Sequence, residues 1–232
     1  ANITITDRKG VVYKGREGKI DASKKVYEQD TPNRTLADAI KDADVFLGMS
    51  GPGVMDAEMV KSMAKDPLVL ALANPNPEIE PHIAFAARDD VIMATGRSDY
   101  PNQVNNVLCF PYLFRGALDC GATTINEEMK RATVYAIADL AMAESSEIVA
   151  DAYVGEKLAF GKEYLIPKPF DPRLILEIAP AVAKAAMDSG VAKRPIEDFD
   201  AYRLQLERFV YKSGMAMKPV FERARANPKR VV

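Results

Sequence analysis

The sequence has few of the residues on which metal centres and disulfide scaffolds depend. It contains two cysteines, Cys109 and Cys120, and one histidine, His82, so a disulfide framework and a histidine-based zinc cluster are both excluded. No apolar run approaches the roughly 18 uncharged residues of a membrane span. The first ten residues carry charges where a signal peptide would be apolar. We therefore expect a cytoplasmic protein with no membrane span.

The sequence also lacks a basic excess. Lys and Arg number 31 against 33 Asp and Glu, which gives a net charge of -2 and argues against a general nucleic-acid-binding protein. With 48% hydrophobic and 28% charged residues, the chain can bury a sizeable core. Its length suits one large domain or two small ones.

Short apolar runs alternate with helical stretches up to about residue 97, which predicts a parallel α/β sheet. The strands are apolar on both faces, so we expect helices on both sides of the sheet. Helices are expected to start at Thr35, where Asp38 completes a capping box, at Asp56 and at Pro81. The predicted strands are residues 3–6, 45–48, 68–72 and 91–94.

Beyond about residue 102 the apolar spacing becomes helical. Asn126 is the predicted N-cap of one helix, a second spans about 171–190 with a kink at Pro180, and a third spans about 198–213. The predicted domains are an α/β domain over 1–125, a helical segment over 126–222 and a linker over 223–232.

In an open parallel sheet, ligands bind beyond the carboxyl ends of the strands. Four loops fall there, at residues 7–10, 50–53, 73–75 and 95–98, although each also fits an ordinary turn. Asp7 suits the acid that binds the adenosine ribose of a dinucleotide, and the neighbouring Arg8 suits the 2′-phosphate of NADP. The ribose interpretation requires a Gly-rich phosphate loop about 20 residues earlier, and the chain contains no G-x-G-x-x-G.

Four side-chain amides lie within residues 102–106. Helix capping explains one of them, so Asn105 and Asn106 are candidates for binding a substrate carboxylate or amide, with Arg97 or Arg115 as a nearby cation. The acidic pairs Glu78/Glu80 and Asp89/Asp90 are interpreted as solvated surface, and no acid–base pair for catalysis is evident.

Several longer strings carry a family resemblance. They are residues 94–111 (ATGRSDYPNQVNNVLCFP), 114–119 (FRGALD), 121–129 (GATTINEEM), 10–16 (GVVYKGR), 72–78 (LANPNPE) and 166–173 (IPKPFDPR). Together they resemble bacterial malic enzymes, over essentially the whole chain. The basic tail resembles the larger hybrid subgroup, in which a phosphotransacetylase-like domain follows.

The resemblance implies a Rossmann-like, doubly wound parallel sheet that lacks its first strand and Gly-rich loop, followed by C-terminal helices. It implies oxidative decarboxylation of (S)-malate to pyruvate and CO₂ with NADP or NAD and with Mg²⁺ or Mn²⁺. The family's Lys base, Tyr acid and metal ligands match positions before Ala1, so this chain is expected to hold no catalytic or metal residue. The matched residues are Asp7, Arg8, Ser50 and Asn74 for the cofactor, and Asn74, Asn105 and Asn106 for the substrate.

We therefore expect the cofactor-binding half of an NADP-preferring malic enzyme, inactive by itself, which needs its N-terminal catalytic half and forms a homo-oligomer. Two alternatives remain open. One is a non-catalytic α/β module that binds a nucleotide or a partner, and the other is a Rossmann dehydrogenase with a different substrate.

Overall fold

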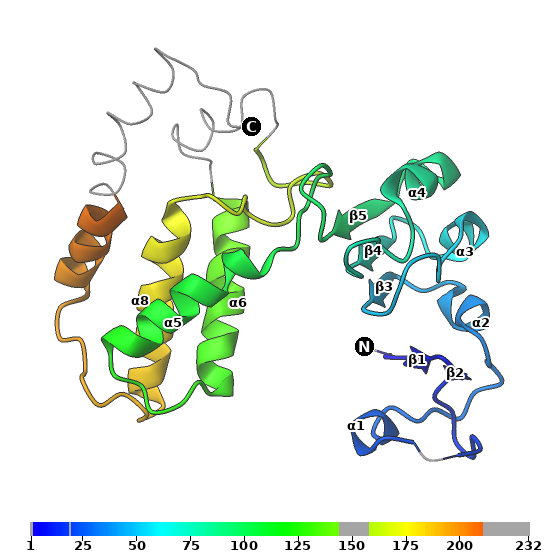
Figure 1. Cartoon of the computed structure of the whole chain (residues 1–232), viewed down its shortest axis with the longest axis horizontal. Coiled ribbons are helices and arrows are strands. Elements are labelled where there is room, and N and C mark those ends of the chain that lie inside the picture. Colours follow the sequence, from blue (N-terminus) through cyan, green and yellow to red (C-terminus); the bar gives the residue numbers. More distant parts are fainter. Residues whose placement is uncertain (1, 19, 144–157, 211–232) are drawn as a thin grey trace, which may run out of the picture. The chain divides into compact units, whose positions relative to one another are not determined.

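A computed structural model describes residues 2–18, 20–143 and 158–210 (Figure 1). The chain divides into two compact units, Ala1–Val104 and Asn105–Val232. The sequence instead predicts a boundary at 125/126, which stays a prediction. The predicted linker over 223–232 lies outside the described residues.

The first unit contains a parallel three-stranded sheet in the order β3-β4-β5. Phe46 is in register with Val69, and Val69 with Met93. The predicted strands at 45–48, 68–72 and 91–94 are thus confirmed to within one residue. The strands are β3 (Val45–Gly48), β4 (Leu68–Ala71) and β5 (Ile92–Thr95), and the helices between and before them are α2 (Leu36–Ile40), α3 (Ala57–Ser62) and α4 (Pro81–Ala87).

The three helices begin where the local sequence predicts. Thr35 and Asp38 form the capping box of α2, and the Asp56 carboxylate accepts a 2.8 Å hydrogen bond from the backbone N–H of Met59 in α3. Pro81 occupies the first turn of α4, where its missing N–H costs no helical hydrogen bond. Each start depends on contacts within four residues, which is why the sequence predicts it.

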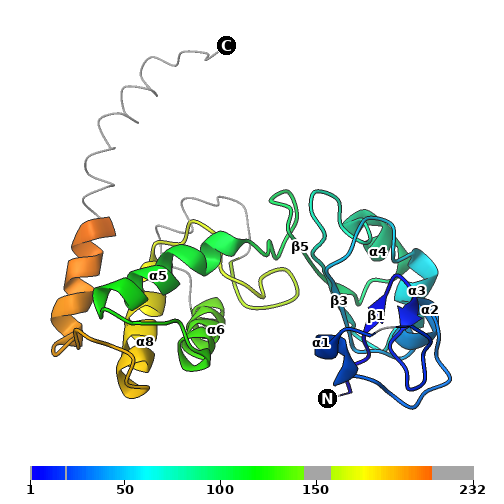
Figure 2. The same ribbon diagram turned by 60° about the horizontal axis from the view of Figure 1, so that its bottom comes forward.

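One face of this sheet carries the core of the first unit. Helices α2, α3 and α4 lie along the same side of β3–β5 (Figures 1 and 2). The opposite face is less covered than predicted, because Val45 and Leu47 of β3 are each 53% exposed in the described part of the chain. The buried core comprises Ile40, Phe46, Met55, Val60, Met63, Val69, Ala71, Ile79, Ala84, Val91 and Met93.

The predicted parallel strand at residues 3–6 is wrong. Instead β1 (Thr6–Asp7) pairs antiparallel with β2 (Gly10–Val11) in a separate two-stranded sheet. Gly10 makes this hairpin possible: its φ is +92°, and a Cβ there would collide with the carbonyl oxygen of Arg34. A short helix, α1 (Ala22–Lys25), follows.

The second unit is helical. Helices α5 and α6 both pack on α8, and Gly116 of α5 allows the close approach because a Cβ there would overlap the carbonyl oxygen of Ala179. The Asn126 side chain caps α6 by accepting a 3.1 Å hydrogen bond from the Met129 N–H, as predicted. The elements are the 3₁₀ turn η1 (Asn106–Leu108), α5 (Phe110–Asp119), α6 (Glu127–Met142), α8 (Arg173–Asp188) and a helix over 199–210.

Two predicted features of this unit remain partly open. Pro180 lies inside α8 as expected, and the kink there stays a prediction. The last helix starts close to the predicted residue 198, and its predicted end at 213 lies outside the described residues. No helix of the described segments is both long and apolar enough to cross a bilayer.

Candidate functional site

The carboxyl ends of β3 and β4 bring two of the predicted cofactor residues to one edge of the sheet. Gly48 and Ala71 are paired residues at these ends, and the loops that follow carry Ser50 and Asn74. Both residues are exposed, as a ligand-binding position requires. The parallel arrangement therefore supports the expectation that these loops face one ligand.

Glu78 joins the same two loops, and the sequence interpretation of this residue is wrong. Its side chain is fully buried rather than solvated. The Oε1 atom accepts hydrogen bonds from the Ser50 N–H at 2.7 Å and the Ser50 hydroxyl at 3.2 Å, while Oε2 accepts one from the Ala73 N–H at 3.1 Å. Glu78 lies between two apolar residues, Pro77 and Ile79, which are both buried. This apolar setting is the feature of the sequence that could have predicted a buried Glu78.

The other acidic residues expected on the surface differ from one another. Glu80 accepts a hydrogen bond from Arg97 at 3.1 Å, and Asp90 forms a two-point ion pair with Arg88 at 2.6 Å. Both side chains are partly buried. Asp89 is exposed, as predicted. Arg97 and Glu80 are 17 residues apart, so sequence spacing does not reveal their ion pair, whereas Arg88 and Asp90 are only two residues apart.

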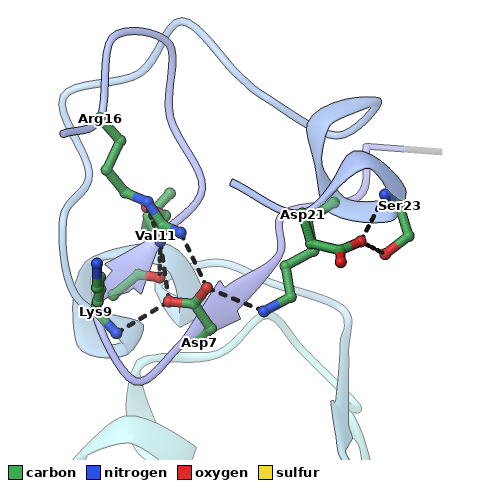
Figure 3. Close-up of polar contacts among 8 residues, drawn as sticks. Asp7, Lys9, Val11, Arg16, Asp21 and Ser23 are labelled. Carbon is green, nitrogen blue, oxygen red and sulfur yellow. Dashed lines mark hydrogen bonds and ion pairs between the residues drawn. The ribbon is translucent and has the colours of Figure 1, made fainter. Parts of the chain in front are cut away.

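Asp7, at the end of β1, forms ion pairs with two cations, Arg16 after β2 and Lys24 in α1 (Figure 3). Its two carboxylate oxygens each accept a hydrogen bond from Arg16 at 2.9 Å, and they also accept from the Lys9 N–H at 2.9 Å and from Lys24 Nζ at 3.1 Å. The hydrogen bonds from Arg16 are the main reason that the pKa of Asp7 lies far below its usual value. Asp7 is therefore ionised, and its four acceptor positions are all used.

Arg8, at the turn of the β1–β2 hairpin, is exposed. It makes no hydrogen bond or ion pair with another described residue, so its guanidinium is available to an anion. Arg16 behaves differently: its side chain is 7% exposed and also donates to the carbonyl oxygens of Gly10 and Val11. No hydrogen bond within the described part of the chain joins Asp7 or Arg8 to Ser50 or Asn74.

The amides of residues 102–106 have separate roles. Asn102 is buried, adopts a φ of +55° and donates from Nδ2 to the Met93 carbonyl at 2.9 Å. Asn105 caps η1, since its Oδ1 accepts a 3.0 Å hydrogen bond from the Val107 N–H. Asn106 is exposed, and its side chain has no hydrogen-bond partner among the described residues. The fold therefore uses Asn102 and Asn105 and leaves Asn106 available.

Asn105 and Asn106 belong to the second unit, whereas Asp7, Arg8, Ser50 and Asn74 belong to the first. Arg97 and Arg115, the two cations considered beside the amides, are already engaged by carboxylates. Arg97 pairs with Asp99 at 2.6 Å, and Arg115 pairs with Asp119 at 2.5 Å.

The remaining reactive groups make no cluster. His82 is exposed, and burial raises the pKa of both cysteine thiols, Cys109 and Cys120. Within residues 2–18, 20–143 and 158–210, no three His, Cys, Asp or Glu side chains come close enough to hold a metal ion.

Comparison with known proteins gives a consistent result. The family model described as "Malic enzyme, NAD binding domain" matches residues 1–150. A Haemophilus influenzae protein named NADP-dependent malic enzyme is 63% identical over 232 residues, which is all of this chain and 31% of the relative. A Rhizobium meliloti protein named NAD-dependent malic enzyme is 62% identical over 231 residues, 30% of its length.

The fold is also similar to that of solved malic enzymes. The Entamoeba histolytica malic enzyme structure superimposes with a TM-score of 0.74 at 31% sequence identity, over 94% of this chain and 44% of that one. The Pyrococcus horikoshii malic enzyme gives a TM-score of 0.66 at 34% identity, over 89% and 46%. The α/β class and the Rossmann-like sheet predicted from the sequence are confirmed. On the family match and on these relatives, the chain belongs to the malic enzyme family and contains its NAD-binding domain.

Proposed function

We propose that this chain is the cofactor-binding and C-terminal part of a longer, NADP-preferring malic enzyme. The complete enzyme would oxidatively decarboxylate (S)-malate to pyruvate and CO₂ and reduce NADP⁺. One observation carries the assignment of the amides: Asn74 and Asn106 are exposed without side-chain hydrogen bonds among the described residues, whereas the fold uses Asn102 and Asn105.

The cofactor preference rests on the charge around Asp7. Residues 7–24 include six Lys or Arg and three Asp or Glu, a net charge of +3. A 2′-phosphate, which NADP carries and NAD lacks, is attracted to such a segment. The exposed guanidinium of Arg8 adds a planar donor pair for a phosphate oxygen. The names of the relatives include both NADP- and NAD-dependent enzymes, so Arg8 is the feature that favours NADP.

In the proposed mechanism the residues of this chain bind and orient the cofactor and malate. Bound NADP⁺ would supply the hydride acceptor for malate. Asp7 would accept hydrogen bonds from the adenosine ribose, Arg8 would bind the 2′-phosphate, and Ser50 and Asn74 would hold the nicotinamide end. Asn74 and Asn106 donate from their amide N–H₂ groups to malate, and Asn105 does so through Nδ2 while its Oδ1 caps η1.

The proton transfers are assigned to residues outside this chain. The proposed Lys base, Tyr acid and carboxylate ligands of Mg²⁺ or Mn²⁺ lie in an N-terminal catalytic half. The chain spans 31% of the Haemophilus relative, which leaves room for that half and for a phosphotransacetylase-like domain. We further propose a cytoplasmic homo-oligomer.

The test is NADP⁺ reduction that depends on malate and Mn²⁺, with the intact mass measured on the same sample. We expect activity from the complete polypeptide and none from the 25.5 kDa chain alone. Activity of the verified 25.5 kDa chain would refute the proposed division, because its catalytic residues would then lie within these 232 positions. A complete polypeptide without malate-dependent activity would refute the proposed reaction.

A further inference from the structure

The carboxylate of Glu78 connects the loop after β3 to the loop after β4 through side-chain hydrogen bonds. A backbone hydrogen bond from the Met55 N–H to the Glu78 carbonyl oxygen, at 3.1 Å, joins the same two segments. We infer that Glu78 is a positioning residue for the cofactor site: it fixes Ser50 and Asn74 relative to each other without touching the cofactor itself. This inference rests on the proposed function, which places Ser50 and Asn74 at the nicotinamide end.

The contacts of Glu78 are specific to these two loops. One oxygen accepts from the Ser50 N–H and hydroxyl, and the other accepts from the Ala73 N–H, directly before Asn74. All three partners are donors, which suits an acceptor-only carboxylate. The side chain has no exposed surface, so a lost hydrogen bond could not be replaced by bulk water.

Glu78 is also not part of an ion pair: no Lys or Arg in the described part of the chain forms a salt bridge with it. A buried carboxylate without a cation is costly unless its hydrogen bonds are satisfied. Two of its three donors are backbone N–H groups of the loops after β3 and β4. The hydrogen bonds that compensate for burial of the carboxylate therefore also hold these two loops in place.

Gly48, the last residue of β3, makes room for this arrangement. A Cβ at this position would collide with the Glu78 carboxyl carbon and lie 2.7 Å from both of its oxygens. The carboxylate thus lies directly against the β3 backbone, at the end of the sheet where the loops begin. The absence of a side chain at Gly48 and the length of the Glu78 side chain together set the spacing of the two loops.

The experiment compares Glu78→Gln with the surface control Glu58→Gln in the complete polypeptide. Glutamine keeps the size of the side chain but replaces one acceptor oxygen by an N–H₂ donor, which faces an N–H of one loop. NADPH binding is measured by the fluorescence of the nicotinamide. We expect Glu78→Gln to raise the NADPH Kd about tenfold and Glu58→Gln, whose side chain is 82% exposed, to leave it unchanged.

A purely structural role could also weaken binding, so the same substitution is made in a background that carries both Ser50→Ala and Asn74→Ala. If Glu78 acts by positioning these two side chains, its substitution should then raise the Kd by less than about threefold, because both side chains are already gone. An equal factor in both backgrounds, or an unchanged Kd in the otherwise wild-type protein, would overturn the inference.

If the Glu78→Gln protein does not fold, Glu78→Asp replaces it in the same NADPH binding test. It keeps the charge, but the shorter side chain cannot reach both loops, and an unchanged NADPH Kd would contradict the positioning role. Failure of the proposed function is distinguishable: without the proposed reaction the wild-type complete polypeptide would show no malate-dependent activity, and without the proposed cofactor it would not bind NADPH.

Discussion

Arg8 provides the sharpest test of the proposed cofactor preference. The substitution Arg8→Ala removes the exposed guanidinium. The net charge of residues 7–24 then falls from +3 to +2. An exposed ion pair contributes up to about 1 kcal/mol, which corresponds to roughly fivefold in Kd. Because the other cations of the segment remain, we expect about a fivefold weaker NADP⁺ Kd and an unchanged NAD⁺ Kd.

The assay determines the Kd of NADP⁺ and of NAD⁺ for the complete enzyme by titration at low and at physiological salt. The difference between wild type and variant should shrink at the higher ionic strength, since the screening length falls to about 8 Å at 0.15 M. Asp7 does not complicate the comparison, because its lowered pKa keeps it ionised at neutral pH. The matched control is Arg131→Ala on the exposed part of α6. Equal losses for the two cofactors would refute the assignment of Arg8 to the 2′-phosphate.

Three further substitutions test the amides and the helical unit. Asn106→Ala should lower kcat/KM for malate in steady-state kinetics, by a factor that corresponds to about 1–3 kcal/mol of lost transition-state stabilisation. Unaltered kinetics would contradict a role of Asn106 in binding the substrate. Asn105→Ala removes the cap of η1 and should cost about 1 kcal/mol, seen as a lower melting temperature, whereas an unchanged melting temperature would show that the cap is dispensable. Gly116→Ala places a methyl group against the Ala179 carbonyl and should destabilise the α5–α8 contact by roughly 1–3 kcal/mol. Gly161→Ala, with its nearest atom at 3.8 Å, is the matched control, and equal melting temperatures for the two variants would contradict the packing argument.

The parts of the fold that the sequence predicts are those determined by neighbours. Thr35, Asp56 and Asn126 cap their helices through backbone N–H groups three residues away. The strands β3, β4 and β5 are short apolar runs with a helix between each pair, so their parallel pairing follows from the order of elements. The whole-chain resemblance then identified the family, which the comparisons confirm.

The errors concern contacts between distant residues. An apolar run before Asp7 looks the same in the sequence whether it pairs with a parallel strand or with the second strand of a hairpin. The glycine at position 10, which the structure shows with a positive φ, is the residue that favours the hairpin. The sequence predicts Glu78 on the surface, because its contacts Ser50 and Gly48 lie about 30 residues earlier in the chain. The partners of Asp7 are likewise not visible in the sequence, since Arg16 lies after β2 and Lys24 lies in α1, and only the fold brings them to the carboxylate.

The saturated carboxylate of Asp7 has a consequence for the thermodynamics of ligand binding. A ribose hydroxyl that reaches Asp7 finds no vacant acceptor position, so it must exchange with a donor already present. Lys24, with a side chain 39% exposed, is displaced more readily than Arg16, at 7%. Such an exchange trades one hydrogen bond for another and yields little net enthalpy. Asp7 would then contribute selectivity for a ligand of the right shape, while the affinity comes from contacts elsewhere.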